Sequence, residues 1–518
     1  MELTTNNYPN YFGDFTFEHC SESVSEVQRA RLMNSSEFQK YMSLNWENQK
    51  RESATPLESK DYASARREKL RNFYDKETLI VPAGVPKVWS NDMDYLFRPH
   101  TAFAYLTGLG KDYEADAVLV MYGDTNEKAL NGKDILYIQP PYDSRTPEFY
   151  KSAQHGEFWI GPRPKLDDFH AWTGITIKDI KHFPVDTGLL DKAKVLAVTG
   201  VDAKVDKLID VKQPKHQDFA RTISELRLVK DPYEIQELQQ ACTSTALAFR
   251  NVARLLPTLN GVAKGERFVE GEFNYAARTL GNGVGYSTIA AAGKNATYLH
   301  WVQNNGTVHD GDLFLLDAGI EMDSLYTADI TRTIPVNGKF SATQLKVYNA
   351  VLEAADEAFK EAKVGNNYSD VHDKAMEVIA KRLVEWQIID SDPNPLESKT
   401  QPHRRFMPHG TGHHLGIDVH DCALARDSLY TDGCIRAGMV FTIEPGLYFR
   451  EDDELVPDEF KGIGVRIEDD ILVTEDGPIR LSGMIPRTAT DVEAWVQGKI
   501  SIVPDENELK DAVNKALS

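Results

Sequence analysis

Cysteine, basic charge and long apolar runs are all scarce in this chain of 518 residues. The chain has four cysteines: Cys20, Cys242, Cys422 and Cys434. They form no C-x-x-C pair, which argues against a disulfide scaffold or a thiolate zinc site. The net charge is −21, whereas nucleic acid or an anionic membrane would require clustered positive charge. No apolar run approaches the roughly 20 residues of a membrane helix, and the first residues lack a signal-peptide pattern. We therefore expect a cytoplasmic protein with reduced thiols and without nucleic-acid or membrane partners.

The first part of the chain predicts an α/β domain behind a polar extension. Residues 1–60 are polar, with a helix-prone patch at 26–49, and we interpret them as an N-terminal extension. In residues 61–225 a helical pattern at 62–74 precedes the apolar runs TLIVPAG, AVLVMYG and DILYIQPP. Short apolar runs that end in turn residues and alternate with helices are typical of an α/β domain.

A long amphipathic helix marks the entry to a second domain, which we place at residues 226–495. The pair Asp231–Pro232 supplies an N-cap and a first-turn proline, the usual start of a helix. Residues 496–518 are interpreted as a C-terminal tail. The overall prediction is therefore an α/β (α+β) protein with two folded domains.

The second domain contains a repeated pattern of acids at the ends of strands. In GDLFLLDAG and GMVFTIEPG an apolar strand ends in an acid, Asp317 or Glu444, six residues after a glycine. Each stretch is followed by another strand with a further acid: TADITRTI carries Asp329 and GVRIEDDILV carries Glu468. Two matched units of this kind indicate duplicated halves whose acids face each other.

A histidine-rich segment, FMPHGTGHHLGIDVHD, lies between the two acidic units and adds imidazole to the carboxylates. Four carboxylates with His413 would carry a formal charge of minus four, which cannot be buried without compensation and which two divalent cations would neutralise. One imidazole among carboxylates suits Mn²⁺, Fe²⁺, Co²⁺ or Zn²⁺ better than Ca²⁺ or Mg²⁺. Two such ions about 3.5–4 Å apart are typical of hydrolases.

These stretches resemble the pita-bread metallopeptidases and, within them, the aminopeptidase P branch. The motifs run in family order as STIAAAGKNATYLHW, LLDAGIE, ADITRTIPVNGKF, PHGTGHHLGIDVHD, TIEPGLYF and GIGVRIEDDILVT. In the first domain RPHTAFAYLTGLG, EFWIGPRP and SELRLVKDPYEI are similar to the family's N-terminal domain. The resemblance covers roughly residues 60–495. It implies a creatinase/prolidase-like N-terminal α/β domain, which would serve oligomerisation and the substrate entrance, and a catalytic pita-bread domain with pseudo-twofold halves.

The resemblance also implies a set of metal ligands. Asp317 would hold one ion, Asp329 and Glu468 would bridge both, and His413 and Glu444 would hold the other. The bridging hydroxide would attack the scissile carbonyl, with Glu444 moving the proton. The ions would be Mn²⁺ first, with Co²⁺, Fe²⁺ or Zn²⁺ as alternatives.

Further residues flank the site in the family. His300, His409 and His420 would bind the substrate carbonyl or the tetrahedral intermediate. Arg466 would orient Glu468 or touch substrate, and Tyr448 is a candidate for the substrate pocket.

His414 and Trp301 lie near these motifs, but we do not assign them a catalytic role. We interpret His414 as structural or as pocket wall, and Trp301 either lines a proline pocket or packs. The interval between Asp317 and Asp329 is one residue longer than the common family form, which predicts a longer hairpin turn.

The expected activity is release of the N-terminal residue from peptides with proline at position 2, by a homodimer or homotetramer. The rival is a prolidase restricted to Xaa-Pro dipeptides, with organophosphate hydrolysis as a side activity. A catalytically inactive peptide-binding module is the alternative of another class, and cleavage of an Xaa-Pro tripeptide separates the first two. The sequence leaves open the physiological metal, the residue preferred before proline and the role of the extension.

Overall fold

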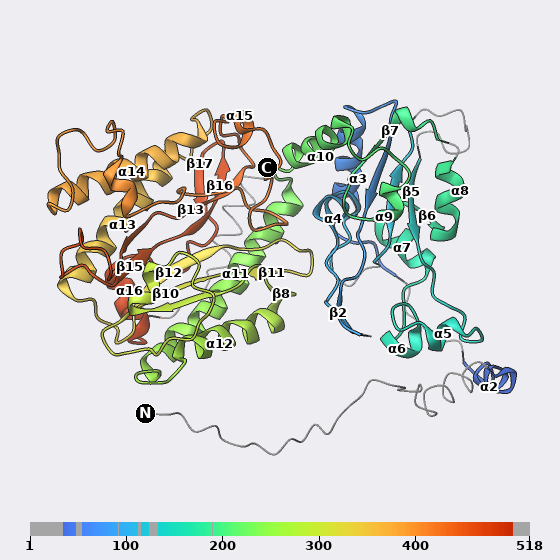
Figure 1. Cartoon of the computed structure of the whole chain (residues 1–518), viewed down its shortest axis with the longest axis horizontal. Helices are drawn as coiled ribbons and strands as arrows, with labels where there is room; N and C mark the ends of the chain where they lie inside the picture. The colour runs from blue at the N-terminus through green and yellow to red at the C-terminus, as the bar shows by residue number, and fades with distance from the viewer. Residues whose placement is uncertain are drawn as a thin grey trace, which may run out of the picture. The chain divides into compact units, whose positions relative to one another are not determined.

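The computed structural model of the chain (Figure 1) describes residues 35–47, 54–91, 93–111, 115–123, 133–188 and 190–500. Two compact units are present, one formed by residues 1–54 and 140–168 and the other by 55–139 and 169–518. Much of the expected extension and nearly all of the expected tail lie outside the described residues. Within the described ranges, no helix combines the length and the apolar character that a membrane crossing requires.

The smaller unit is held together by aromatic side chains from short helices. These are α2 (Ser36–Met42), α5 (Glu148–Lys151) and α6 (Glu157–Ile160). Phe38 meets the ring of Tyr150 edge-on, and Trp46 meets Phe149 in the same way. Helix α2 falls inside the helix-prone patch predicted at 26–49, of which residues 26–34, 48 and 49 are not among the described ones.

The larger unit begins with a mixed sheet of order β6-β5-β4-β1-β7. Its strands are β1 (Thr78–Pro82), β4 (Val118–Met121), β5 (Asp134–Ile138), β6 (Thr176–Asp179) and β7 (Val195–Ala197). Strand β1 pairs antiparallel with β4 and parallel with β7. The three apolar runs predicted as strands are β1, β4 and β5, and their side chains are almost all buried because they form the core of this sheet.

Helices surround this sheet and supply the rest of its core. They are α3 (Lys60–Arg71), α4 (Thr101–Thr107), α7 (Leu166–Thr173), α8 (Phe183–Gly188), α9 (Ala203–Asp206) and α10 (Pro214–Leu226), with the 3₁₀ turns Ile180–His182 and Lys192–Lys194. A ribbon of β2 (Val88–Ser90) and β3 (Met93–Asp94) projects before α4. Ile80, Val120, Tyr137 and Phe183 pack together in one buried cluster. The α/β domain expected at the start of the chain is thus confirmed as a mixed sheet with helices.

The first half of the second predicted domain consists of two long helices followed by short strands. Helix α11 (Pro232–Leu255) begins at Asp231, and Glu234 completes a capping box with it. Helix α12 (Gly265–Leu280) packs against α11. Strands β9 (Ile289–Ala292), β10 (Leu313–Ala318) and β12 (Ile330–Pro335) form one sheet, and β8 (Gly283–Val284) pairs with β11 (Ile320–Glu321). The 3₁₀ turns Leu256–Thr258 and Gly293–Thr297 connect these elements.

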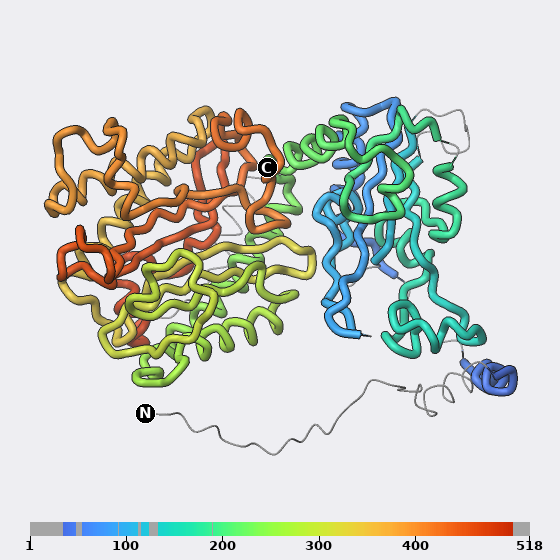
Figure 2. The backbone as a smooth tube through the Cα atoms, in the orientation of Figure 1, coloured from blue at the N-terminus to red at the C-terminus, as the bar shows by residue number. Residues whose placement is uncertain are grey.

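The second half repeats this plan. Helices α13 (Ala342–Glu361) and α14 (Tyr368–Glu385) pack together and precede the sheet of β13 (Val440–Ile443), β16 (Asp469–Thr474) and β17 (Gly477–Arg480). Strands β14 (Gly446–Phe449) and β15 (Ile463–Arg466) form the ribbon. The 3₁₀ turn Pro402–Arg405, α15 (Asp427–Tyr430) and α16 (Ala489–Val496) complete it. In Figure 2 the two halves run from green to yellow and from orange to red, and β12 packs against β15 and β16.

Candidate metal centre and active site

The four acids singled out in the sequence lie at the ends of strands from both halves. Asp317 is on β10 opposite Thr331 of β12, and Asp329 comes directly before β12. Glu444 follows β13, and Glu468 lies between β15 and β16. The two segments that carry Asp317 and Asp329 pack closely at Gly319, because a Cβ there would lie 1.7 Å from the carbonyl oxygen of Ala328. A larger residue at this position would push the two segments apart.

His413 reaches the carboxylates from the glycine-rich segment. Its backbone N–H donates to Thr442 Oγ1 at 3.1 Å, and its carbonyl accepts from the Thr442 N–H at 2.9 Å. The ring atom Nδ1 lies 3.2 Å from the carbonyl oxygen of His414, so Nδ1 carries the proton that is donated there. Nε2 then faces Asp329 Oδ2 at 3.1 Å and Glu444 Oε1 at 3.7 Å. Loss of the Nε2 proton would leave that nitrogen available as a metal ligand.

The five side chains line one cavity of about 610 Å³. Asp329, His413 and Glu468 each offer a ligand atom within 4.8 Å of the others. Asp317 is joined to this group because the Tyr286 hydroxyl, which contacts Asp329, also lies 2.6 Å from Asp317 Oδ1. Four carboxylates and an imidazole in one place form an oxygen- and nitrogen-donor set of the kind that first-row divalent metals prefer.

The electrostatics of the cluster also fit a cation. Burial, with the charges of Asp329 and Glu444, raises the pKa of Glu468 well above its ordinary value. Burial, with the neighbouring charge of Asp329, raises the pKa of Glu444 to about 7. Burial alone would raise the pKa of Asp329 as well, but the hydrogen bond and charge of His413 hold it below the ordinary value. The carboxylates therefore repel each other, and positive charge would relieve that repulsion.

Arg466, Tyr448 and His409 form a connected chain beside the carboxylates. Arg466 Nη2 donates to Asp317 Oδ2, and Nη1 donates to the Tyr448 hydroxyl at 3.0 Å. The Tyr448 hydroxyl lies 2.9 Å from His409 Nε2, while His409 Nδ1 lies 2.7 Å from the carbonyl oxygen of Gly410. Both ring nitrogens of His409 therefore already have hydrogen-bond partners, the Gly410 carbonyl oxygen and the Tyr448 hydroxyl. Arg466 and His409 line the cavity, whereas Tyr448 is buried behind them.

His300 and His420 are the more exposed histidines of the cavity. Both line it, and the His420 ring centre lies 4.1 Å from that of His413. Burial, with the charge of His413, lowers the pKa of His420, which favours a neutral ring. Neutral imidazoles at a cavity wall are suited to hydrogen bonding with a substrate carbonyl.

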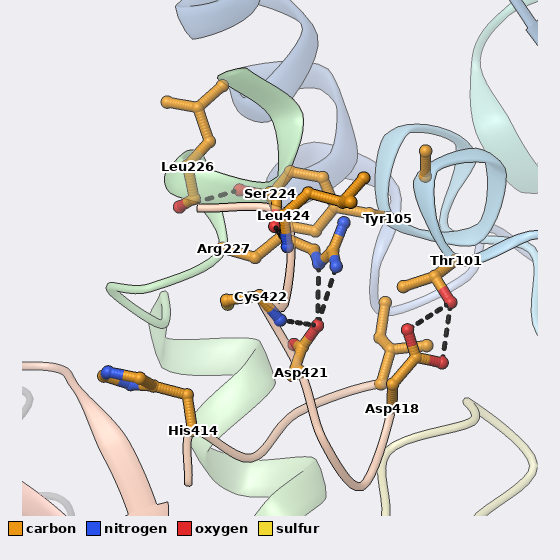
Figure 3. Close-up of polar contacts among 12 residues, drawn as sticks. Thr101, Tyr105, Ser224, Leu226, Arg227, His414, Asp418, Asp421, Cys422 and Leu424 are labelled. Carbon is orange, nitrogen blue, oxygen red and sulfur yellow. Dashed lines mark hydrogen bonds and ion pairs between the residues drawn. The ribbon is translucent and has the colours of Figure 1, made fainter. Parts of the chain in front are cut away.

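Two other residues that the sequence singled out, Trp301 and His414, pack against neighbouring side chains. Trp301 Nε1 donates to Glu266 Oε2 at 2.8 Å, and its ring packs on the cluster that contains Ile289 and Leu315. His414 is buried between Tyr368 and Tyr430, facing away from Asp421 in Figure 3. Neither side chain lines the cavity of the metal cluster, so both pack in this structure.

Three supporting residues were not predicted from the sequence. Tyr286 contacts two of the carboxylates, the Thr331 hydroxyl donates to Glu468 Oε2 at 2.6 Å, and Thr442 Oγ1 lies 3.4 Å from Glu444 Oε1. Thr331 and Thr442 each stand two residues from an acid, on the same face of a strand. This spacing of two residues from an acid is the sequence pattern that could have predicted both threonines as supporting residues. Tyr286 had none, because it lies in a short connection far from its partners.

The fold and the site together define a metallopeptidase. Metallopeptidase family M24 matches residues 236–475, and the N-terminal domain of aminopeptidase P matches residues 62–195. A Streptomyces coelicolor protein, Xaa-Pro aminopeptidase 2, is 41% identical over 89% of this chain and 96% of its own length. Human Xaa-Pro aminopeptidase 3 is 32% identical over 85% of this chain and 86% of its own.

Solved structures agree with the sequence relatives. Escherichia coli aminopeptidase P with the inhibitor Pro-Leu superposes with a TM-score of 0.74 at 28% identity, covering 86% of this chain and 99% of that one. A zinc-substituted form of the same enzyme with product matches equally well, with a TM-score of 0.74. The chain therefore belongs to metallopeptidase family M24, in its aminopeptidase P branch. It is a metallo-aminopeptidase, a hydrolase that uses divalent metal, and the predicted fold class with its pita-bread domain is confirmed.

Proposed function

We propose that the chain removes the N-terminal residue from peptides whose second residue is proline, using two divalent metal ions. The observation that carries this proposal is the convergence of four buried carboxylates and His413 in one cavity. The relatives named Xaa-Pro aminopeptidase support the substrate class. The tertiary amide before proline has no N–H, so a protease that cuts it needs a pocket built for that bond.

The proposed ligand assignment is the one that the family resemblance implies, and the grouping of the side chains supports it. Asp329 and Glu468, whose ligand atoms lie close to that of His413, would contact both ions. Asp317 would hold one ion, and His413 with Glu444 would hold the other. Imidazole and carboxylate together favour Mn²⁺, with Co²⁺, Fe²⁺ or Zn²⁺ as alternatives.

The chain's own residues would then divide the chemistry. When bound, the two ions polarise the scissile carbonyl and lower the pKa of water at the site. Glu444, at the edge of the cluster, takes a proton from the attacking water and passes it to the proline nitrogen, which must be protonated to leave. His300 and His420 donate hydrogen bonds to the carbonyl oxygen as its negative charge develops. Arg466 holds Asp317 in place and, through Tyr448, fixes the ring of His409.

A peptide panel tests the substrate class. We expect turnover of an Xaa-Pro-Ala tripeptide, with release of the first amino acid, and at least a hundredfold lower kcat/KM for the matching Xaa-Ala-Ala peptide. Turnover of Xaa-Pro dipeptides with no cleavage of the tripeptide would identify a prolidase instead. Organophosphate hydrolysis, tested with a fluorophosphonate-type substrate, is expected only as a side activity. The homodimer or homotetramer implied by the resemblance stays a prediction.

A further inference from the structure

A second cavity, of about 470 Å³, adjoins the active site, and His420 lines both. Its walls come from α4, α10 and the loop after His413. We call it the Arg227 cavity and define it by His100, His216, Arg221, Arg227, Asp418 and His420. The volume lies within the range of about 300–1,000 Å³ that small-ligand pockets have. The two cavities therefore share His420 as a wall residue, and the second cavity lies next to the acidic cluster.

The acidic groups beside the Arg227 cavity are already satisfied. Asp418 accepts from the Thr101 hydroxyl at 2.7 Å and faces Arg98 Nη1 at 3.2 Å. Asp421 accepts from Arg227 Nε at 3.0 Å and from Nη2 at 2.8 Å (Figure 3). The third guanidinium nitrogen of Arg227 points away from Asp421 in the same view and meets no hydrogen-bond partner among the described residues. Within the residues described, the cavity therefore contains an unpaired donor, this nitrogen of Arg227, beside carboxylates that already have partners.

Two histidines, the buried His216 and the partly buried His100, add donors to that wall. His216 Nδ1 accepts from the Ala197 N–H at 3.2 Å, and His100 Nδ1 accepts from the Ala102 N–H at 3.2 Å. A backbone N–H can only donate, so both Nδ1 atoms are unprotonated and the neutral rings carry their proton on Nε2. Burial is the first cause that lowers the pKa of each ring, which keeps them neutral. Within the described part of the chain, neither Nε2 has a hydrogen-bond acceptor of its own.

We propose that the Arg227 cavity binds the part of a peptide substrate that follows the proline, with peptide carbonyl oxygens and the C-terminal carboxylate accepting from His100, His216 and Arg227. This inference rests on the proposed function. The metal cluster must hold the first residue, the scissile bond and the proline, so the chain beyond the proline has to leave the active site. The neighbouring cavity that shares His420 offers donors from Arg227 and the two histidines, and peptide backbone and carboxylate oxygens are acceptors.

The test uses the metal-loaded enzyme and Xaa-Pro peptides of three and five residues. The pentapeptide is expected to have a kcat/KM about tenfold above that of the tripeptide, through a lower KM, as one good hydrogen bond would give. Ala220 lies on α10 at the cavity wall and is only partly buried, so a large side chain there fills the space without entering the core. In Ala220→Trp the pentapeptide should lose its tenfold advantage while the tripeptide keeps its rate, and Ala220→Ser should behave as wild type.

Three outcomes overturn the inference: no advantage of the pentapeptide in the wild type, equal loss for both lengths in Ala220→Trp, or no loss for either. The carboxylate contact is tested separately by amidating the C-terminus of the pentapeptide, which should raise its KM severalfold. Equal KM values for acid and amide would overturn that contact. Failure of the proposed function is distinguishable, because then neither Xaa-Pro peptide is cleaved at all.

Discussion

Tyr286 is the side chain that ties the ligands of the first half together. Its hydroxyl lies within hydrogen-bond distance of both Asp317 and Asp329, and the side chain is partly buried at the wall of the cavity. Burial, with the charges of those two acids, raises the pKa of Tyr286 well above its ordinary value, so it stays a donor. Partners of this kind fix the orientation of metal ligands and tune their affinity.

Removing that hydroxyl should weaken metal binding without unfolding the protein. For Tyr286→Phe we expect a metal affinity about 10–100-fold lower, because Asp317 and Asp329 lose their shared donor. Competition with a fluorescent chelator measures the change in Kd. Tyr275→Phe is the matched control, since Tyr275 on α12 is 68% exposed and remote from the carboxylates. An unchanged Kd in Tyr286→Phe would show that the hydroxyl does not position the ligands.

Asp421 makes a pH-dependent contribution to stability at the residue scale. It is buried between Arg227 at 2.8 Å and Lys230 at 3.7 Å. Burial alone would raise the pKa of Asp421, but the two cations lower it below the ordinary value. A folded-state pKa below the unfolded one stabilises the protein above the unfolded pKa, about 3.9, and that stability is lost as pH falls through the folded pKa.

The variant Asp421→Asn should therefore be less stable than wild type at pH 7, by about 3–5 kcal/mol, because a buried ion pair loses one partner. The difference should begin to shrink below about pH 4, where the unfolded chain takes up the proton, and should be lost as the pH falls through the lower folded-state pKa of Asp421. Urea unfolding at several pH values measures both effects. Asp373→Asn, at an exposed position on α14, should change the free energy of unfolding by less than about 0.5 kcal/mol. If the difference in free energy of unfolding between wild type and Asp421→Asn did not depend on pH, it would contradict the charge-pair explanation.

At the scale of elements, the strand-end acids were predictable because their signal is local. β10 and β13 are apolar runs that end at an acid followed by a small residue and glycine, and α11 begins at the Asp231–Pro232 signal. The Arg227–Asp421 pair could not be predicted in the same way, since its members are 194 residues apart. Tyr286, which lies 31 residues from Asp317, gave no pattern either. Contacts made only by tertiary packing leave no spacing in the sequence.

The hairpin between Asp317 and Asp329 gives a prediction at this scale. Gly319→Ala should destabilise the protein and weaken metal binding, because its Cβ would meet the Ala328 carbonyl oxygen at 1.7 Å and force the strands apart. Gly271→Ala is the control, at an exposed position on α12 with no atom within 4 Å of the added Cβ. There alanine should stabilise by roughly 0.5–1 kcal/mol through helix propensity. Thermal unfolding measures the stability of the two variants, and metal content measures their metal binding. Unchanged stability and metal content in Gly319→Ala would show that the hairpin has room to adjust.

At the scale of the whole molecule, the metal site couples activity to stability. The carboxylates raise each other's pKa, so the folded protein gains when cations bind. A ligand that binds only the folded state at 100 times its Kd stabilises it by about 2.7 kcal/mol. Dialysis against a chelator should therefore abolish peptidase activity and lower Tm, and added Mn²⁺ should restore both. Full activity after complete metal removal would contradict the proposed chemistry.

The most direct test of the central claim combines metal content with turnover of an Xaa-Pro tripeptide. The wild-type chain should bind two divalent ions and release the first residue. Asp329→Ala and Glu468→Ala should each lose tripeptide turnover and fall below two ions per chain, because these side chains are assigned to both ions. A variant of either residue that kept two bound ions and normal turnover would contradict the two-metal site proposed for this chain.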